Sequence, residues 1–180
     1  MKNNTNIVVI GLGYVGLPLA VKFGEKYNTL GYDINKTRIS ELKNNIDSTK
    51  ELTKSEIEGS HLIKFTDNEK DISVGDIYII TVPTPITKFR EPNIVPLLNA
   101  SKLVGSKIKQ GDIVVYESTV YPGCTEDDCV PVLEQISGLK YGADFACGYS
   151  PERIVPGDKE RTLTKIKKIV SATDKKTLLT

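Results

Sequence analysis

Short apolar runs alternate along this chain with longer segments that carry apolar residues at helical spacing. Ile7–Ile10 is a continuous apolar run, which is typical of a strand buried on both faces of a parallel sheet. In the next segment Val15, Leu19 and Phe23 recur at intervals of four residues, which predicts a helix with one buried face. Strands and helices that alternate at these lengths form right-handed βαβ units. The pattern therefore predicts an α/β fold with a doubly wound, mostly parallel Rossmann-type sheet.

The same two spacings define the other expected elements. We expect strands at residues 29–33, 62–65, 76–82, 112–116, 145–148 and 166–172, and helices at residues 14–27, 35–44, 93–109 and 125–137, with short helices after residues 53 and 174. Asn35 and Asn93 are suited to cap the helices that follow them. Pro131 should kink its helix or mark a later start, because proline lacks an amide hydrogen. No linker-like stretch divides the chain, so we expect one domain over residues 1–180.

Composition and charge exclude several classes of protein. With 24 Lys and Arg against 23 Asp and Glu, the chain lacks the basic excess that nucleic-acid binding requires. A hydrophobic content of 39% supplies a core and excludes disorder, and the apolar runs are too short for a membrane span. Three cysteines without a signal peptide indicate free thiols and a cytoplasmic location. His61 is the only histidine, so the ligands of a structural zinc site are missing.

The first candidate site is a glycine loop, Gly11-Leu12-Gly13-Tyr14-Val15-Gly16, which has the pattern G-x-G-x-x-G. It follows a predicted strand and opens a predicted helix, the context in which this pattern binds dinucleotides. Gly11 allows the tight turn, Gly13 lets the backbone approach a pyrophosphate, and Gly16 lets helix and strand pack closely. The phosphates are expected at the N-terminus of the helix.

An acidic residue follows the second predicted strand. Asp33 stands 22 residues after Gly11, where a carboxylate binds the hydroxyls of the adenosine ribose and repels a 2′-phosphate. This favours NAD over NADP, although Arg38 is close enough in sequence to serve a 2′-phosphate. The alternative is a glycine turn with a capping aspartate and a solvated arginine.

Three further motifs follow predicted strands at the edge where ligands bind. Val82-Pro83-Thr84-Pro85 is either part of a ligand site or a rigid turn. In Glu117-Ser118-Thr119 the two hydroxyls can hold a ligand or water, or cap a helix. Glu152 and Arg153 can orient a substrate or form a surface ion pair. Cys124 is either a thiolate at a helix N-terminus or a buried thiol, and Cys129 and Cys147 are expected in the core.

These motifs occur in an order that resembles the N-terminal, NAD-binding half of the UDP-glucose/GDP-mannose dehydrogenase family. The resemblance covers residues 6–174 and includes Pro18 after the glycine loop, Pro122-Gly123 and Pro156-Gly157. It implies an enzyme that oxidises the C6 alcohol of a nucleotide sugar to a carboxylate with two NAD⁺. It also implies a cofactor site made of Gly11, Gly13, Tyr14, Val15 and Gly16 at the pyrophosphate, Asp33 and Arg38 at the adenosine, and Val82, Pro83, Thr84, Ser118 and Thr119 near the nicotinamide ribose.

The resemblance also implies roles in catalysis and substrate binding. Thr119 and Glu152 would hold the water of the hydrolytic step, since a carboxylate beside a hydroxyl can move its proton. Arg153 stands where members that act on UDP-glucose have Phe-Leu. The segment is most similar to enzymes for UDP-N-acetylglucosamine or UDP-N-acetylgalactosamine, and UDP-N-acetylmannosamine stays open. Such an enzyme would be a homodimer that supplies polysaccharide synthesis, such as capsule or O-antigen.

The sequence departs from the family at one decisive point. The family's nucleophilic cysteine lies in a Gly-Gly-His-Cys-like motif with a catalytic lysine further on, and these 180 residues contain neither motif. Only the first turns of the last predicted helix precede Thr180, so we expect a fragment that lacks the nucleotide-sugar-binding domain and is inactive alone. Two alternatives remain: a non-catalytic NAD(P)-binding regulatory module, and another Rossmann dehydrogenase, such as the 3-hydroxyacid type, which is not expected to carry Pro151-Glu152-Arg153.

Overall fold

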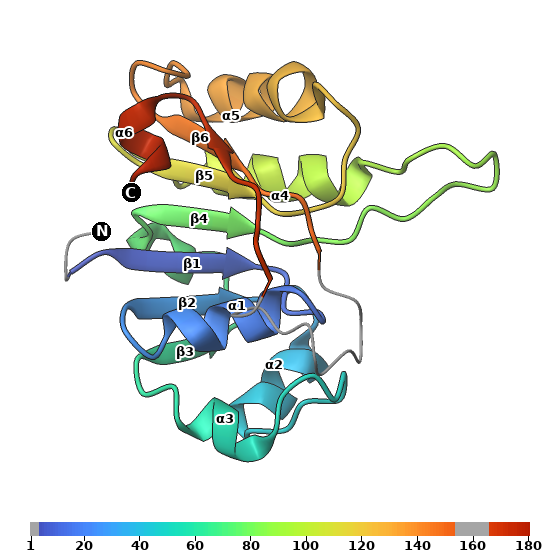
Figure 1. Ribbon diagram of the computed structural model, residues 1–180, viewed down its shortest axis with the longest axis vertical. Coiled ribbons are helices and arrows are strands. Elements are labelled where there is room, and N and C mark those ends of the chain that lie inside the picture. The colour runs from blue at the N-terminus through green and yellow to red at the C-terminus, as the bar shows by residue number, and fades with distance from the viewer. Residues whose placement is uncertain (1–3, 154–165) are drawn as a thin grey trace.

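A computed structural model describes residues 4–153 and 166–180 and has one mixed sheet at its centre (Figure 1). The strand order is β3-β2-β1-β4-β5-β6-β7, and neighbouring strands are parallel except for β6 and β7. The strands are β1 (Asn6–Ile10), β2 (Asn28–Tyr32), β3 (Ile63–Thr66), β4 (Ile77–Ile80), β5 (Ile113–Tyr116), β6 (Ala146–Tyr149) and β7 (Ser171–Ala172). The predicted doubly wound, mostly parallel Rossmann-type sheet is confirmed.

Helices lie on both faces of the sheet and bury two separate apolar clusters. The α-helices are α1 (Gly16–Phe23), α2 (Lys36–Lys43), α3 (Lys54–Glu58), α4 (Val95–Gly105), α5 (Val130–Ser137) and α6 (Lys175–Leu178), with a 3-10 turn η1 (Asp71–Val74) and a π turn η2 (Thr125–Cys129). Strand β1 serves both clusters, because Val8 and Ile10 face one and Ile7 and Val9 face the other. A continuous apolar run is thus the pattern of a strand covered on both faces.

Several helix starts follow the expected capping chemistry. The Asn35 side chain accepts hydrogen bonds from the amides of Thr37 and Arg38, as predicted. Thr53 and Glu56 form a reciprocal capping box at the start of α3. Asn93 accepts a hydrogen bond from the Val95 amide at 3.1 Å, although α4 begins two residues later than expected.

Pro131 marks a later helix start, which was one of its two predicted effects. The segment from Thr125 to Cys129 forms a π turn, and the α-helical part begins at Val130. Proline fits the first turn of a helix because its missing amide hydrogen would have had no partner there.

Two further predicted elements were wrong in extent. Residues 14 and 15 belong to the glycine loop and not to the helix, which begins at Gly16. The strand expected at residues 166–172 is only the antiparallel pair Ser171–Ala172. Ile169 and Val170 are 65% and 56% exposed, so their apolar side chains do not reach the core that a buried strand would need. Pro156-Gly157 lies outside the described residues.

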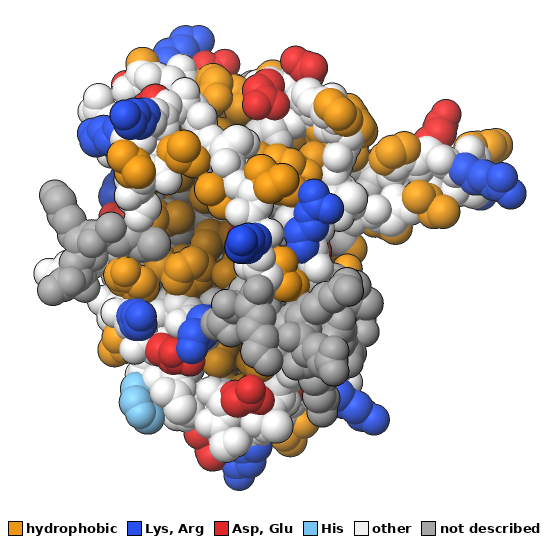
Figure 2. All heavy atoms as spheres, viewed as in Figure 1, with side chains coloured by type: hydrophobic (Ala, Val, Ile, Leu, Met, Phe, Trp, Pro, Cys, Tyr) orange, Lys and Arg blue, Asp and Glu red, His pale blue; other side chains and the backbone are white. Residues whose placement is uncertain are grey.

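The segment after β4 leaves the body of the molecule as a narrow arm, seen at the right of Figure 2. An isolated antiparallel bridge between Ile86 and Pro92 holds the two sides of the arm together. Ile86 and Phe89 are exposed on it, and the Lys88 ammonium lies 5.0 Å from the centre of the Phe89 ring. No helix in the described part of the chain is long and apolar enough to cross a membrane.

Candidate cofactor site

The predicted site motifs meet at the carboxyl edge of the sheet, at the tips of the strand arrows in Figure 1. The glycine loop leaves β1, Asp33 follows β2, and Val82 follows β4. Strand β1 lies between β2 and β4, and the connections from it run in opposite directions along the sheet. Ligands of open α/β sheets bind at such a switch point.

The three glycines of the loop have distinct steric roles. Gly11 has a φ of +93°, which favours glycine. A Cβ on Gly16 would lie 1.9 Å from the Gly11 carbonyl oxygen, so only glycine lets α1 pack against the loop. A Cβ on Gly13 would meet nothing within 4 Å, and this residue is exposed. The loop therefore closes on itself at Gly11 and Gly16 and stays open at Gly13, which fits the approach of a pyrophosphate.

The carbonyl oxygens of the loop are bound from behind. The Thr81 hydroxyl lies 2.7 Å from the Gly11 oxygen, and Arg38 Nε donates to the Leu12 oxygen at 2.9 Å. The Gly13 oxygen accepts from the Leu17 amide at 3.1 Å. Within the described ranges, 4–153 and 166–180, no acceptor is bound to the amides of residues 13–16. With the carbonyls of residues 11–13 occupied and the amides of residues 13–16 open at a helix N-terminus, the loop can accept an anion.

Asp33 is held in place by two backbone amides. Its Oδ2 accepts from Leu12 and its Oδ1 from Asn35, both at 2.8 Å. Each carboxylate oxygen can accept more than one hydrogen bond, so these contacts leave capacity for ribose hydroxyls. Asp33 thus links the end of β2 to the loop that would carry the phosphates.

Arg38 is not the solvated arginine of the alternative interpretation. Its side chain is only 8% exposed, and its Nη2 lies 2.8 Å from an oxygen of Asp47. Burial raises the pKa of Asp47, but hydrogen bonds from Thr49, Leu52 and Arg38 outweigh burial, and the net pKa is lowered. The charged Arg38 guanidinium therefore binds the Leu12 carbonyl oxygen and helps to fix the glycine loop. The predicted contact of Arg38 with the adenine side stays a prediction.

The motifs after β4 and β5 are joined by two short hydrogen bonds. Ser118 Oγ donates to the Val82 carbonyl oxygen, and Thr84 Oγ1 donates to the Thr119 carbonyl oxygen, both at 2.6 Å. The hydroxyls of Ser118 and Thr84 thus fix the two loops to each other. Thr119 and Pro83 are exposed beside this junction, where a ligand can reach them.

Two carboxylates lie next to this junction. Glu117 is buried and pairs with the Lys168 ammonium. The Oε2 atom of Glu152 is also buried, and its Oε1 accepts from the backbone amide of the exposed Arg153. Burial, together with the charge of Glu152, raises the pKa of Glu117 despite the ion pair. A buried ion pair therefore lies two residues from Thr119 in the chain.

The cysteines do not take part in this site. Cys124, Cys129 and Cys147 are free and buried. Burial raises the pKa of Cys124, and it raises that of Cys129 to about 12. The buried interpretation of Cys124 is confirmed and the reactive thiolate is not, because a thiol with a raised pKa is a poor nucleophile.

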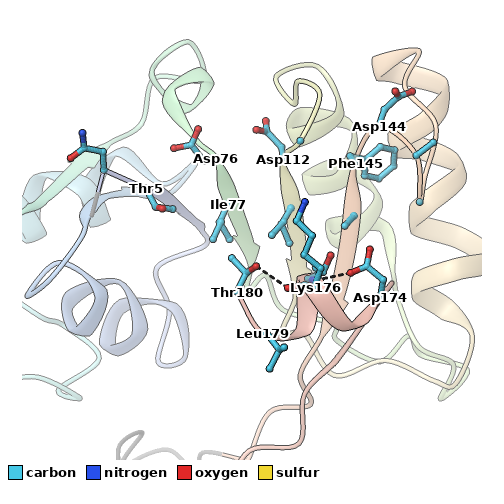
Figure 3. A pocket seen from close by; sticks show the side chains of 17 residues that line it. Thr5, Asp76, Ile77, Asp112, Asp144, Phe145, Asp174, Lys176, Leu179 and Thr180 are labelled. Atoms are coloured by element: carbon cyan, nitrogen blue, oxygen red, sulfur yellow. Dashed lines mark hydrogen bonds between the residues drawn. The ribbon is translucent and has the colours of Figure 1, made fainter. Parts of the chain in front are cut away.

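A cleft of about 780 Å³ lies at the opposite, amino-terminal edge of the sheet (Figure 3). It is lined by Asp76, Asp112 and Asp144 at the sheet and by Lys176 and Leu179 of the C-terminal segment. None of the predicted site residues lines it.

Two residues that matter for the site were not predicted. Thr81 is the last residue before Val82, and its place at the end of an apolar strand was an available signal. The sequence did not indicate the pairing of Lys168 with Glu117, because the two residues are 51 positions apart and Lys168 lies in a stretch that was expected to be a strand.

The fold and the glycine loop define a Rossmann-type dinucleotide-binding domain. Residues 5–179 match the NAD binding domain of the UDP-glucose/GDP-mannose dehydrogenase family, and the chain belongs to this family. The family resemblance and the NAD cofactor are thus confirmed.

The chain is similar to proteins of known name. It is 54% identical over 169 residues to a UDP-N-acetyl-D-glucosamine 6-dehydrogenase of Salmonella typhi, which covers 94% of this chain and 40% of that protein. It is 56% identical over 168 residues to the protein CapL of Staphylococcus aureus, with 93% and 39% covered. A solved NDP-N-acetyl-D-galactosaminuronic acid dehydrogenase of Methanosarcina mazei superposes with a TM-score of 0.86 at 31% identity, over 97% of this chain and 40% of that one. The chain thus spans about 40% of the length of these relatives.

Proposed function

We propose that the chain is the NAD-binding part of a nucleotide-sugar 6-dehydrogenase that converts the C6 alcohol of a UDP-N-acetylhexosamine to the uronic acid. The observation that supports this proposal is the shared sheet edge, where the glycine loop follows β1, Thr119 follows β5 and Glu152 follows β6. The names of the similar proteins support the choice of substrate class. The product would supply polysaccharide synthesis.

In this proposal the chain's residues hold and orient the cofactor. The amides of residues 13–16 bind the pyrophosphate, and Asp33 binds the adenosine ribose. Arg38 and Thr81 hold the loop from behind, since they bind its carbonyl oxygens. Val82, Pro83, Thr84, Ser118 and Thr119 form the wall for the nicotinamide ribose. When bound, NAD⁺ accepts a hydride from the carbon that is oxidised.

The hydrolytic step is assigned to Thr119 and Glu152. The oxygen of a water molecule bonds to the acyl carbon of a sugar–enzyme adduct, and the bond from that carbon to the enzyme's sulfur breaks. The water proton passes to Glu152, and Thr119 orients the water. The exposed position of Thr119 and the partly buried carboxylate of Glu152 support this division of roles.

Arg153 is assigned to the substrate. Its exposed guanidinium carries planar donors that suit an acyl carbonyl, a hydroxyl or a phosphate. We place UDP-N-acetylglucosamine and UDP-N-acetylgalactosamine before UDP-N-acetylmannosamine as substrates.

The remaining parts of the proposal concern the longer protein. The region of the relatives that this chain does not match would supply the cysteine nucleophile, the catalytic lysine and the nucleotide-sugar-binding domain, and the enzyme would be a homodimer. Residues 1–180 would form one NAD-binding domain without turnover of their own.

The test is NADH formation from UDP-N-acetylglucosamine by the longer protein, followed by absorbance. We expect turnover by the longer protein and none by the 180-residue chain. Turnover by residues 1–180 would place the chemistry in this chain and contradict the proposal. NAD binding without turnover by the longer protein on any UDP-hexose would favour the regulatory module.

A further inference from the structure

Arg38 and Asp47 form a buried ion pair next to the glycine loop. The side chain of Arg38 is 8% exposed, and that of Asp47 is fully buried. Arg38 Nε donates to the Leu12 carbonyl oxygen at 2.9 Å, and the Leu12 amide donates to Asp33 Oδ2 at 2.8 Å. A single residue, Leu12, therefore lies between the guanidinium and the carboxylate that is expected at the adenosine ribose.

A guanidinium this close to the ribose is the kind of group that a 2′-phosphate would need. Arginine binds phosphate through paired hydrogen bonds from its planar donors. In this structure, however, each nitrogen of Arg38 lies against an acceptor of the protein. Nε binds the Leu12 oxygen, Nη1 lies 3.2 Å from Ser48 Oγ, and Nη2 lies 2.8 Å from Asp47 Oδ1. The donors that could bind a phosphate are already in use.

The Asp47 carboxylate is fixed by its own turn, between α2 and α3. Its Oδ1 accepts from the Thr49 amide at 3.0 Å and from the Thr49 hydroxyl at 2.6 Å. Its Oδ2 accepts from the amides of Glu51 and Leu52, both at 2.9 Å. These contacts hold the carboxylate in place independently of Arg38. Release of Arg38 would leave a buried carboxylate without its counter-ion, which is strongly unfavourable.

We propose that Asp47 is a positioning residue that sets the choice of cofactor, because it holds the Arg38 guanidinium away from the 2′ position of the adenosine ribose. NADP then meets the repulsion of Asp33 without the attraction of Arg38. NAD has no 2′-phosphate and needs no cation at that position. The inference rests on the proposed cofactor site, in which Asp33 binds the ribose.

The experiment measures the affinities of NADH and NADPH for Asp47→Asn by calorimetry on the longer protein. An asparagine is uncharged, and its one carbonyl oxygen cannot serve both the guanidinium and the amides of residues 51 and 52. The ratio of NADPH affinity to NADH affinity should therefore rise by roughly tenfold or more, the value of a hydrogen bond to a charged group. A merely structural role for Asp47 would weaken both cofactors in proportion. An unchanged ratio overturns the inference.

A second cation on α2 requires a further comparison. Lys36 is exposed and stands three residues after Asp33. The gain for NADPH should persist when Lys36→Met is added to Asp47→Asn, and it should disappear when Arg38→Gln is added instead. Damage to the loop that weakens both cofactors cancels in the affinity ratio. A gain that survives Arg38→Gln, or one that is lost with Lys36→Met, contradicts the inference.

The matched control is Asp112→Asn, at the opposite edge of the sheet. The Asp112 side chain is 3% exposed and pairs with the Lys109 ammonium at 2.9 Å, so this variant also removes one charge from a buried aspartate. The affinity ratio should remain that of the unchanged protein. A rise as large as that in Asp47→Asn would mean that the ratio responds to the loss of any such pair, and the inference would fail.

If Asp47→Asn does not fold, a variant that keeps the ion pair decides. Asp33→Asn combined with Lys36→Met removes the repulsion and the exposed cation, while Arg38 and Asp47 stay paired. We expect no preference for NADPH in this variant. A tenfold preference for NADPH would show that the guanidinium reaches the 2′-phosphate, and it would overturn the inference alone. Absence of NADH binding by the unchanged longer protein would instead contradict the proposed cofactor site.

Discussion

The Asp33 carboxylate accepts a hydrogen bond from the Leu12 amide at 2.8 Å, so the acid expected at the ribose also fixes the glycine loop. The same peptide group is held from its other side, where Arg38 Nε donates to the Leu12 carbonyl oxygen at 2.9 Å. We therefore expect a substitution at Asp33 to change both the proposed cofactor selectivity and the geometry of the glycine loop.

We expect the chain to bind NAD⁺ or NADH in preference to NADP⁺, because the Asp33 carboxylate repels a 2′-phosphate. Asp33→Ala should weaken NADH binding by roughly tenfold or more, which is the effect of losing hydrogen bonds to a charged group. Calorimetry with both cofactors measures this. Equal affinities for NADH and NADPH in the unchanged chain would contradict the selectivity.

Gly13 and Gly16 should respond differently to the same added methyl group. Gly16→Ala places a Cβ 1.9 Å from the Gly11 oxygen, so it should destabilise the fold by about 1–3 kcal/mol or more. Gly13→Ala meets nothing within 4 Å, so it should leave the melting temperature unchanged and weaken NADH binding. Thermal melts and calorimetry on both variants separate the two effects. Loss of stability in Gly13→Ala, or unimpaired NADH binding by it, would argue against a phosphate at this position.

Thr81 should support cofactor binding indirectly, because its hydroxyl binds the Gly11 carbonyl oxygen of the glycine loop. Thr81→Val keeps the side-chain shape but removes the hydroxyl at 2.7 Å from the Gly11 oxygen. We expect NADH affinity to fall by about 2–10-fold, the value of one ordinary hydrogen bond. Thr81→Ser keeps the hydroxyl and is the control that should retain affinity. Equal affinities for NADH in the Val and Ser variants would refute the role of the hydroxyl.

Glu152→Gln should slow acid release more than the first hydride transfer in the longer enzyme. A general base contributes about 10²–10⁴-fold in rate, so a covalent sugar–enzyme adduct should accumulate. Intact mass spectrometry would detect the adduct. Ordinary turnover in Glu152→Gln would show that Glu152 is not the general base of the hydrolytic step.

Arg153→Leu should change substrate choice and leave stability unaltered, because Arg153 is exposed. In the longer enzyme the KM for the N-acetylated sugar should rise more than the KM for UDP-glucose. Steady-state kinetics with both sugars is the measurement. An unchanged preference would remove the main support that this residue gives to the N-acetylhexosamine assignment.

Patterns with a fixed spacing in the sequence were sufficient to predict the fold and the position of the glycine loop. The glycines at residues 11, 13 and 16 and the acid at residue 33 each meet a local steric or electrostatic demand, so their spacing is informative. The apolar runs of β1 and β4 likewise reflect burial on both faces.

Contacts made by tertiary packing could not be predicted in this way. Nothing in the sequence indicated that the buried guanidinium of Arg38 would pair with Asp47. Ile169 and Val170 are β-branched, as residues of strands often are, but both are exposed, and Lys168 next to them pairs with Glu117. Side-chain pairs of this kind depend on where distant elements dock, which a periodic pattern does not encode.

The separation of 51 residues between Glu117 and Lys168 has a consequence for synthesis on the ribosome. At about 5–20 residues per second, Lys168 leaves the ribosome roughly 3–10 s after Glu117. During that interval β6 becomes available for pairing with β5, while Glu117 has not yet met its counter-ion. The nascent sheet therefore assembles with this carboxylate either protonated or still in water, and its ion pair forms only when Lys168 arrives.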